Sequence, residues 1–140
     1  MSLGDVVVER QLSNAEARQA ICSLWSLRED EILVVNDLAE LVSMNDPRRV
    51  LCHKWHIEGG QFATVLSFHE GEFMDQSSEA TAERLTQILR SRCLVSDASD
   101  NPYRMVMFNG DGQAQVVNLN PDKLDNGMYE IAGIFPTPTS

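Results

Sequence analysis

The chain of 140 residues is acidic, with 21 Asp and Glu against 11 Lys and Arg and a formal net charge of −10. This surplus excludes nucleic acid as a partner, because a polyanion would be repelled by the surface. The length is that of one domain, and a hydrophobic share of 43% suffices for one core without a metal or disulfide. We therefore expect a single domain over residues 1–140, with loose termini at about 1–4 and 136–140.

The cysteines and the N-terminus favour a cytoplasmic location. Cys22, Cys52 and Cys93 are odd in number and far apart, as is typical of buried thiols in a reducing compartment. No basic segment followed by an apolar stretch opens the chain, and no run of roughly 18 apolar residues occurs, so we expect neither a signal peptide nor a membrane partner. The acids are spread along the whole chain, which leaves a basic protein surface as the best specific partner.

Two helices are expected near the N-terminus, after a short strand at 6–8. Ser13 is a good N-cap and Glu16 completes a capping box, which predicts a helix from about 14 to 27. A brief strand at 32–35 follows. A second, shorter helix is then expected to begin after Asn36 or Asp37 and to end at Asn45-Asp46-Pro47.

The clearest pattern is a hairpin whose strands, 49–57 and 61–69, flank Glu58-Gly59-Gly60. If the two glycines form the turn, Ile57 lies opposite Phe62 and one face of the hairpin is apolar. That core face carries Leu51, His53, Trp55, Ile57, Phe62, Leu66 and Phe68. The other face is mixed and carries Cys52, Lys54, His56, Ala63, Ser67 and His69.

The second half of the chain predicts one helix and three further strands. These are a helix at about 79–92, a hairpin of strands 103–108 and 113–119 around Asn109-Gly110-Asp111-Gly112, a turn at 121–127 and a last strand at 128–135. The element order predicts an α+β fold. Its antiparallel sheet has about five strands, in the order hairpin, helix, hairpin, strand, and packs with two N-terminal helices and one central helix.

Strand geometry argues against a metal site among the three histidines and Cys52. Cys52 and His53 are neighbours in a strand and point to opposite faces. His56 and His69 share a predicted face but lie about 20 Å apart at ~3.3 Å per residue, whereas zinc ligands lie within ~2.0–2.3 Å of one ion. We therefore predict no metal ligands and no cofactor.

The sequence also names no catalytic residue, because no nucleophile stands beside a base that a third group orients. His53 admits two interpretations, a core histidine with one satisfied hydrogen bond or a polar group that lines a pocket. The second interpretation predicts a ligand-binding site formed by His53, Trp55, Tyr103 and Tyr129.

Four apolar side chains are candidates for partner contacts. Met105 and Met107 share one face of the second hairpin with Tyr103, where they form either part of the core or an adaptable contact surface. Phe73 and Met74 stand alone in an acidic connection, so exposed contact roles are expected for them.

These patterns leave open two classes of function. The first is a non-catalytic binding or protein-interaction module, expected to form a homodimer. In size, charge and alternation of helices with antiparallel strands the chain is similar to small acidic bacterial secretion chaperones, although the final helix usual in that family is missing. The alternative is a small-molecule-binding domain or enzyme with a pocket between sheet and helices near His53 and Trp55.

Overall fold

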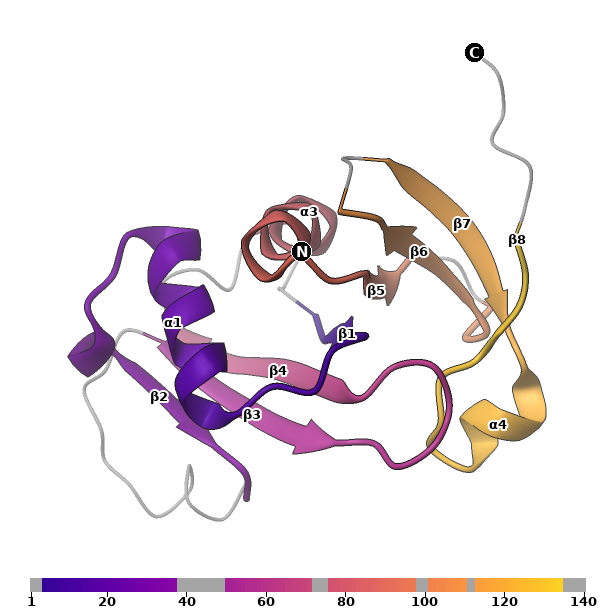
Figure 1. Cartoon of the computed structure of the whole chain (residues 1–140), viewed down its shortest axis with the longest axis horizontal. Helices are drawn as coiled ribbons and strands as arrows, with labels where there is room; N and C mark the ends of the chain where they lie inside the picture. The colour runs from indigo at the N-terminus through magenta and orange to yellow at the C-terminus, as the bar shows by residue number, and fades with distance from the viewer. Residues whose placement is uncertain (1–3, 38–49, 72–75, 98–100, 111–112, 135–140) are drawn as a thin grey trace.

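A mixed sheet with the strand order β2-β3-β4-β1-β5-β6-β7-β8 organises the chain in this computed structural model (Figure 1). The structure describes residues 4–37, 50–71, 76–97, 101–110 and 113–134. Its strands are β1 (Val6–Val8), β2 (Ile32–Val35), β3 (Val50–His56), β4 (Thr64–Gly71), β5 (Cys93–Ser96), β6 (Arg104–Phe108), β7 (Ala114–Leu119) and β8 (Ile131–Ile134). Strands β2 and β3 pair in parallel, and the other strand pairs are antiparallel.

The helices are α1 (Asn14–Trp25), the 3₁₀ turn η1 (Glu29–Glu31), α3 (Ser78–Leu89) and α4 (Pro121–Asp125). The α+β class is therefore confirmed, but the sheet is larger than the expected five strands and is not wholly antiparallel. The second N-terminal helix falls on residues outside those described, as do both termini except Gly4. Among the helices that the structure describes, none combines the length and apolar character required to cross a membrane.

Helix α1 begins where its capping box predicts. The Ser13 hydroxyl accepts a hydrogen bond from the Glu16 amide at 3.1 Å, and the Glu16 carboxylate accepts one from the Ser13 amide at 3.0 Å. The helix ends at Ser26, which adopts the left-handed conformation with φ 54°. Its buried side chains are Ala17, Ala20, Ile21 and Leu24.

Helix α3 stops earlier than predicted, and this explains why β5 was missed. Arg90 follows the helix in the left-handed conformation, with φ 53°, and its amide donates to the Thr86 carbonyl. The chain then becomes extended, and Cys93 to Ser96 pair with both β1 and β6. A short apolar run directly after a helix gave no periodic signal that could separate the two elements.

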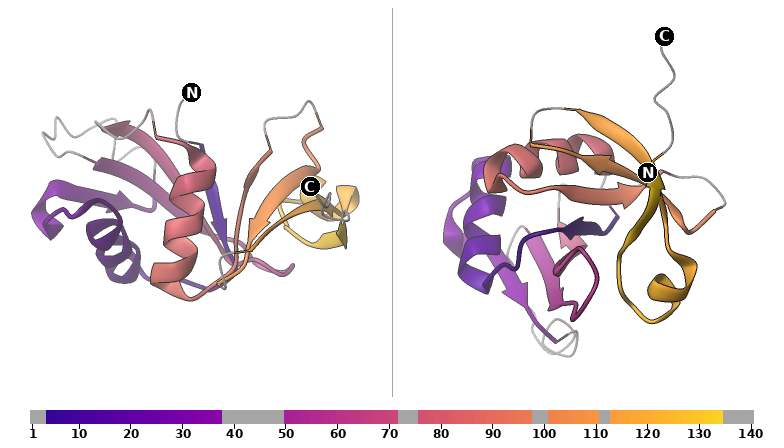
Figure 2. Two further views of the ribbon diagram at one scale, coloured as in Figure 1. Left: turned by 90° about the horizontal axis from the view of Figure 1, so that it is seen from above. Right: turned by 45° about the vertical axis from the view of Figure 1, so that its right-hand side comes forward.

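The sheet separates two cores. Helices α1 and α3 pack together over one face, where they bury strand residues such as Val8, Cys52 and Phe108 in the first cluster (Figure 2). The opposite face, which α1 and α3 do not cover, buries a second cluster made of Val7, Phe62, Val65, Leu94, Met105, Met107, Val117 and Leu119, and Leu124 of α4 packs against it. Both faces of the central strands are therefore apolar. The sequence of β1, three consecutive valines, is consistent with burial on both faces.

The first hairpin exists, but its predicted register is wrong by one residue. Trp55 pairs with Val65 and His53 with Ser67, rather than with Thr64 and Leu66. A shift of one residue exchanges the faces of β4 relative to β3. As a result Cys52 and Lys54, expected on the mixed face, share the helix-covered face with Leu66 and Phe68, while Trp55 lies on the other.

The loop of residues 58–62 sets this register, because it is anchored far along the chain. The Gln61 amide donates to the Tyr129 carbonyl, and the Gln61 side chain accepts from the Ile131 amide, each at 2.8 Å. Gly60 has φ 76°, and a Cβ there would lie 2.9 Å from the Tyr129 carbonyl oxygen. We call these contacts the clasp. It joins the first hairpin to the β7–β8 connection.

Two cysteines make stability sensitive to alkaline pH. Burial raises the pKa of Cys52 from an ordinary 9.0 to about 12 and that of Cys93 to about 11. Above pH 9 the unfolded chain loses protons that the folded chain keeps, so stability falls as pH rises. We expect each thiol to cost about 2 kcal/mol by about pH 10.5. Urea unfolding across pH should show a shallower decline for Cys52→Ala, and a slope equal to that of wild type would contradict the assignment.

Candidate functional site

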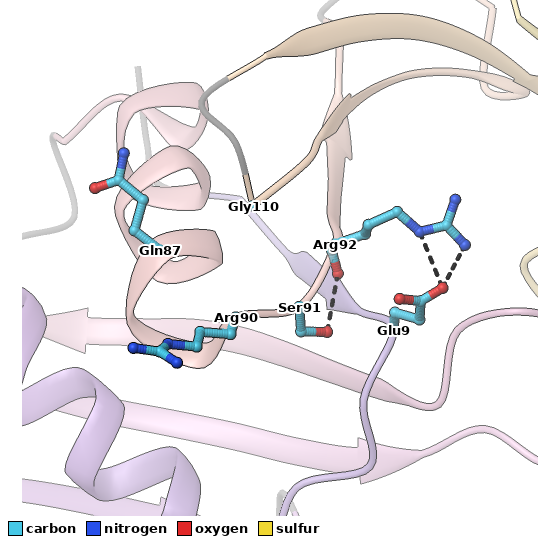
Figure 3. A pocket seen from close by; sticks show the side chains of 6 residues that line it. All are labelled: Glu9, Gln87, Arg90, Ser91, Arg92 and Gly110. Atoms are coloured by element: carbon cyan, nitrogen blue, oxygen red, sulfur yellow. Dashed lines mark hydrogen bonds and ion pairs between the residues drawn. The ribbon is translucent and has the colours of Figure 1, made fainter.

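A polar hollow of about 430 Å³ lies at the C-terminal end of α3 (Figure 3). It is formed by the residue after β1, the end of α3, the connection from α3 to β5 and the β6–β7 turn. The residues that line it are Glu9, Gln87, Arg90, Ser91, Arg92 and Gly110. Because they come from three separate stretches of the chain, no local sequence pattern could have predicted the hollow.

Arg92 is fixed on one side of this hollow by several contacts. Its Nε donates to Glu9 Oε2 at 2.9 Å, and its Nη2 forms an ion pair with the same oxygen. The guanidinium carbon lies 5.6 Å from the ring centroid of Phe62, a cation–π distance, and Nη1 lies 3.7 Å from the sulfur of Met107. The charge of Arg92 is therefore compensated by Glu9, and its side chain covers part of the second cluster.

The other side of the hollow carries the exposed side chains of Gln87 and Arg90, which extend away from Arg92 in Figure 3. Within the described part of the chain, Arg90 forms no ion pair, so it supplies a local positive charge on an otherwise acidic protein. The Ser91 hydroxyl accepts a hydrogen bond from the Arg10 amide at 3.0 Å. These residues can bind a polar group, but they hold no nucleophile beside an oriented base.

The structure brings three of the predicted ligand residues to one core. Trp55, Tyr103 and Tyr129 all pack, partly buried, against the second cluster on the face opposite α1 and α3. Burial raises the pKa of Tyr129, so its hydroxyl stays protonated near neutral pH. These three side chains lie on the face away from α1 and α3, where Leu124 of α4 packs against the same cluster. Their binding of a ligand stays a prediction.

His53 is not a buried core residue. It is half-buried beside Trp55, with ring centroids 4.8 Å apart, and its Nε2 lies 3.1 Å from the Asn36 carbonyl oxygen. Its ring centroid is also 6.1 Å from that of His69 on β4. The predicted register had placed these two histidines on opposite faces.

The predicted partner residues divide between core and undescribed chain. Met105 and Met107 are buried in the second cluster, so they offer no exposed surface, and the core alternative accounts for them. Val106 and Phe108 lie in the first cluster, as the alternation of the hairpin predicts. Phe73 and Met74 fall outside the described residues.

Sequence reasoning missed the buried lysine of β3. Lys54 is only 2% exposed, its Nζ donates to the Leu12 carbonyl at 3.0 Å, and it lies 3.4 Å from His56 Nε2. Burial lowers the pKa of Lys54. The one local indication of its burial was that Lys54 lies two residues from Cys52 and therefore shares its strand face. The wrong register assigned that face to the mixed side of the hairpin, so the indication was lost.

Comparisons with protein-family models, with curated proteins and with solved structures give no match to this chain. In the part of the chain that the structure describes, no group of three or more His, Cys, Asp or Glu side chains is arranged to hold a metal ion.

Proposed function

We propose that this protein is a non-catalytic interaction module that binds another protein along the outer edge of β8. The observation that carries the proposal is the exposure of this strand. Ile134 is 54% exposed, and Ala132 and Gly133 beside it are also exposed. The unpaired backbone of an edge strand is a template for pairing with another chain.

The position of β8 suits the addition of a further strand. It is the terminal strand of the sheet, and it pairs on one side with β7, from Val117 with Ile134 to Leu119 with Ile131. No strand in the described ranges covers its other side. An extended peptide could therefore pair with the backbone of β8 while an apolar side chain covers Ile134.

The charge of the chain favours one kind of partner. A protein with a net charge of −10 attracts a basic surface and repels an acidic one, and this includes a second copy of itself. A partner segment that combines apolar and basic residues therefore fits best. A secretion-chaperone-like capture of an extended segment is a more specific version of this proposal. A homodimer through the same edge is the alternative, and it would have to overcome the repulsion between two acidic copies.

Replacing Ile134 by lysine tests whether a partner binds at the outer edge of β8. The change places a charge where a partner side chain would pack, and we expect it to weaken association at least tenfold, as loss of about 1.5–3 kcal/mol of apolar burial implies. The measurement is affinity capture from the source cell, with the captured partner then titrated against the purified variant. Sedimentation velocity of the variant and the wild type reports self-association.

Ile88→Lys provides the matched control, because Ile88 is an exposed isoleucine (37%) on α3, away from β8. It should keep wild-type association. Equal affinity of Ile134→Lys and wild type for the captured partner, together with a monomeric wild type, would overturn the proposal.

The hollow beside α3 supports small-molecule binding as a second candidate function. Its volume lies within the range of about 300–1,000 Å³ that is typical of ligand pockets, and Arg90, which forms no ion pair with the residues that the structure describes, would favour an anionic ligand. This site differs from the predicted one near His53 and Trp55. Stabilisation of the protein by small carboxylates or phosphates, lost in Arg90→Gln, would favour this function over the interaction module.

A further inference from the structure

We propose that His53 and His69 form a binding site for a divalent transition metal ion, such as Zn²⁺ or Ni²⁺, on the face of the sheet opposite α1 and α3. The two rings come from the neighbouring antiparallel strands β3 and β4, and their centroids are 6.1 Å apart with an interplanar angle of 46°. Imidazole nitrogens are favoured ligands of these ions.

The one-residue register is what creates the pair. His53 on β3 pairs with Ser67 on β4. An irregularity between Leu51 and Cys52 leaves His69 without a direct partner on β3, between the paired residues Phe68 and Glu70. His69 is therefore the diagonal neighbour of His53, on the same face. In the register expected from the turn glycines, the two side chains would point to opposite faces.

The ring separation suits coordination of a shared ion. Two imidazoles that bind one ion at about 2.0–2.1 Å bring their ring centroids to roughly 5–6 Å. The observed 6.1 Å therefore needs a side-chain movement of only about an ångström. His69 is exposed and His53 half-buried, so solvent can reach both rings and water can fill the remaining coordination positions.

The hydrogen bonds of the two rings also suit this role. His53 Nε2 lies 3.1 Å from the Asn36 carbonyl oxygen, which can only accept, so Nε2 carries the proton and Nδ1 keeps its lone pair. A ligand histidine that donates its other N–H to a carbonyl is the usual arrangement at metal sites. His69 Nε2 contacts the Ser67 hydroxyl at 3.3 Å, and the tautomer in which Nε2 donates to this hydroxyl leaves Nδ1 available.

Trp55 provides an internal reporter of this site. Its ring lies 4.8 Å from that of His53, centroid to centroid, whereas Trp25 packs against Phe68 on the helix-covered face. A paramagnetic ion bound between the two histidines should quench the fluorescence of Trp55 and leave that of Trp25 unchanged. Titration of the untagged full chain with Ni²⁺ should therefore give partial, saturable quenching of tryptophan fluorescence, and calorimetric titration with Zn²⁺ should give one site per chain.

The variants His53→Gln and His69→Gln should each weaken Ni²⁺ and Zn²⁺ binding at least tenfold, because each removes one of two ring ligands. His56→Gln is the matched control, since the third histidine lies on the opposite face of β3. It should bind both ions as wild type does. Far-ultraviolet circular dichroism and urea unfolding should show that all three variants are folded.

Two results would overturn the proposal. One is Ni²⁺ and Zn²⁺ binding that is unchanged in His53→Gln and His69→Gln, which would place the ion elsewhere. The other is the absence of saturable binding by wild type at millimolar ion, which would show that the two rings do not act together.

Discussion

Replacing Phe62 by alanine is expected to destabilise the protein by about 3–5 kcal/mol, the usual cost of deleting a buried phenylalanine ring. Phe62 is 1% exposed and belongs to the second cluster, which α1 and α3 do not cover. Its ring also supports the Arg92 guanidinium. The substitution removes apolar packing and leaves Arg92 without the surface on which it rests. Urea unfolding monitored by circular dichroism measures the loss.

Phe62→Leu serves as the matched control, because it keeps most of the apolar volume and should cost less than half as much. A loss below about 1 kcal/mol for Phe62→Ala would contradict the packing of the second cluster, since a buried ring cannot be removed from a tight core at so small a cost. Retention of the Glu9–Arg92 ion pair in the Leu variant can be followed by the effect of Glu9→Gln in each background.

Replacing Lys54 by alanine is expected to cost about 2–5 kcal/mol, as for other long buried side chains. The change opens a cavity beside the first cluster and leaves the Leu12 carbonyl without its Nζ donor. Lys54→Met fills the cavity and removes the buried charge. It should cost clearly less than Lys54→Ala, because relief from burying an ammonium group offsets the lost hydrogen bond.

The two lysine variants also differ from wild type in their pH dependence. Because burial lowers the pKa of Lys54 from 10.5, the unfolded chain binds this proton more tightly than the folded chain, and the contribution of Lys54 to the stability of wild type rises with pH toward 10.5. The stability difference between wild type and Lys54→Met should therefore grow with pH in favour of wild type. The Cys93 contribution cancels, since both proteins carry that thiol, and a Cys52→Ala background removes the coupling between Cys52 and Lys54. A difference that is constant from pH 7 to about 10 would contradict the buried charge.

The local elements of this fold could be predicted where a short segment determines its own structure. The capping box of Ser13 and Glu16 is such a case, because both hydrogen bonds form within one turn of α1. The alternation of the second hairpin, which separates Met107 from Phe108, is another. In both cases the residues that decide the structure are neighbours in the sequence.

The register of the first hairpin could not be predicted in this way. The glycines of its loop favoured a tight turn, but the loop is held by Tyr129 and Ile131, which lie far along the chain. Every side-chain assignment on β4 depended on that register, so the pairing of His69 with His53 was lost with it. The hollow at Arg92 could not be predicted for the same reason, because the segments that form it meet only in the folded chain.

The clasp between Gln61 and Ile131 also has a consequence for the order of folding. It closes a loop of sequence separation 70, so the entropy of bringing its ends together must be overcome before the contact stabilises anything. During synthesis the first hairpin emerges well before β8, because the chain is made from its N-terminus. The helix-covered half can thus assemble early, whereas the packing around Phe62 is completed only after the C-terminal strand has been synthesised. The late step of folding and the exposed edge of the finished sheet belong to the same short segment.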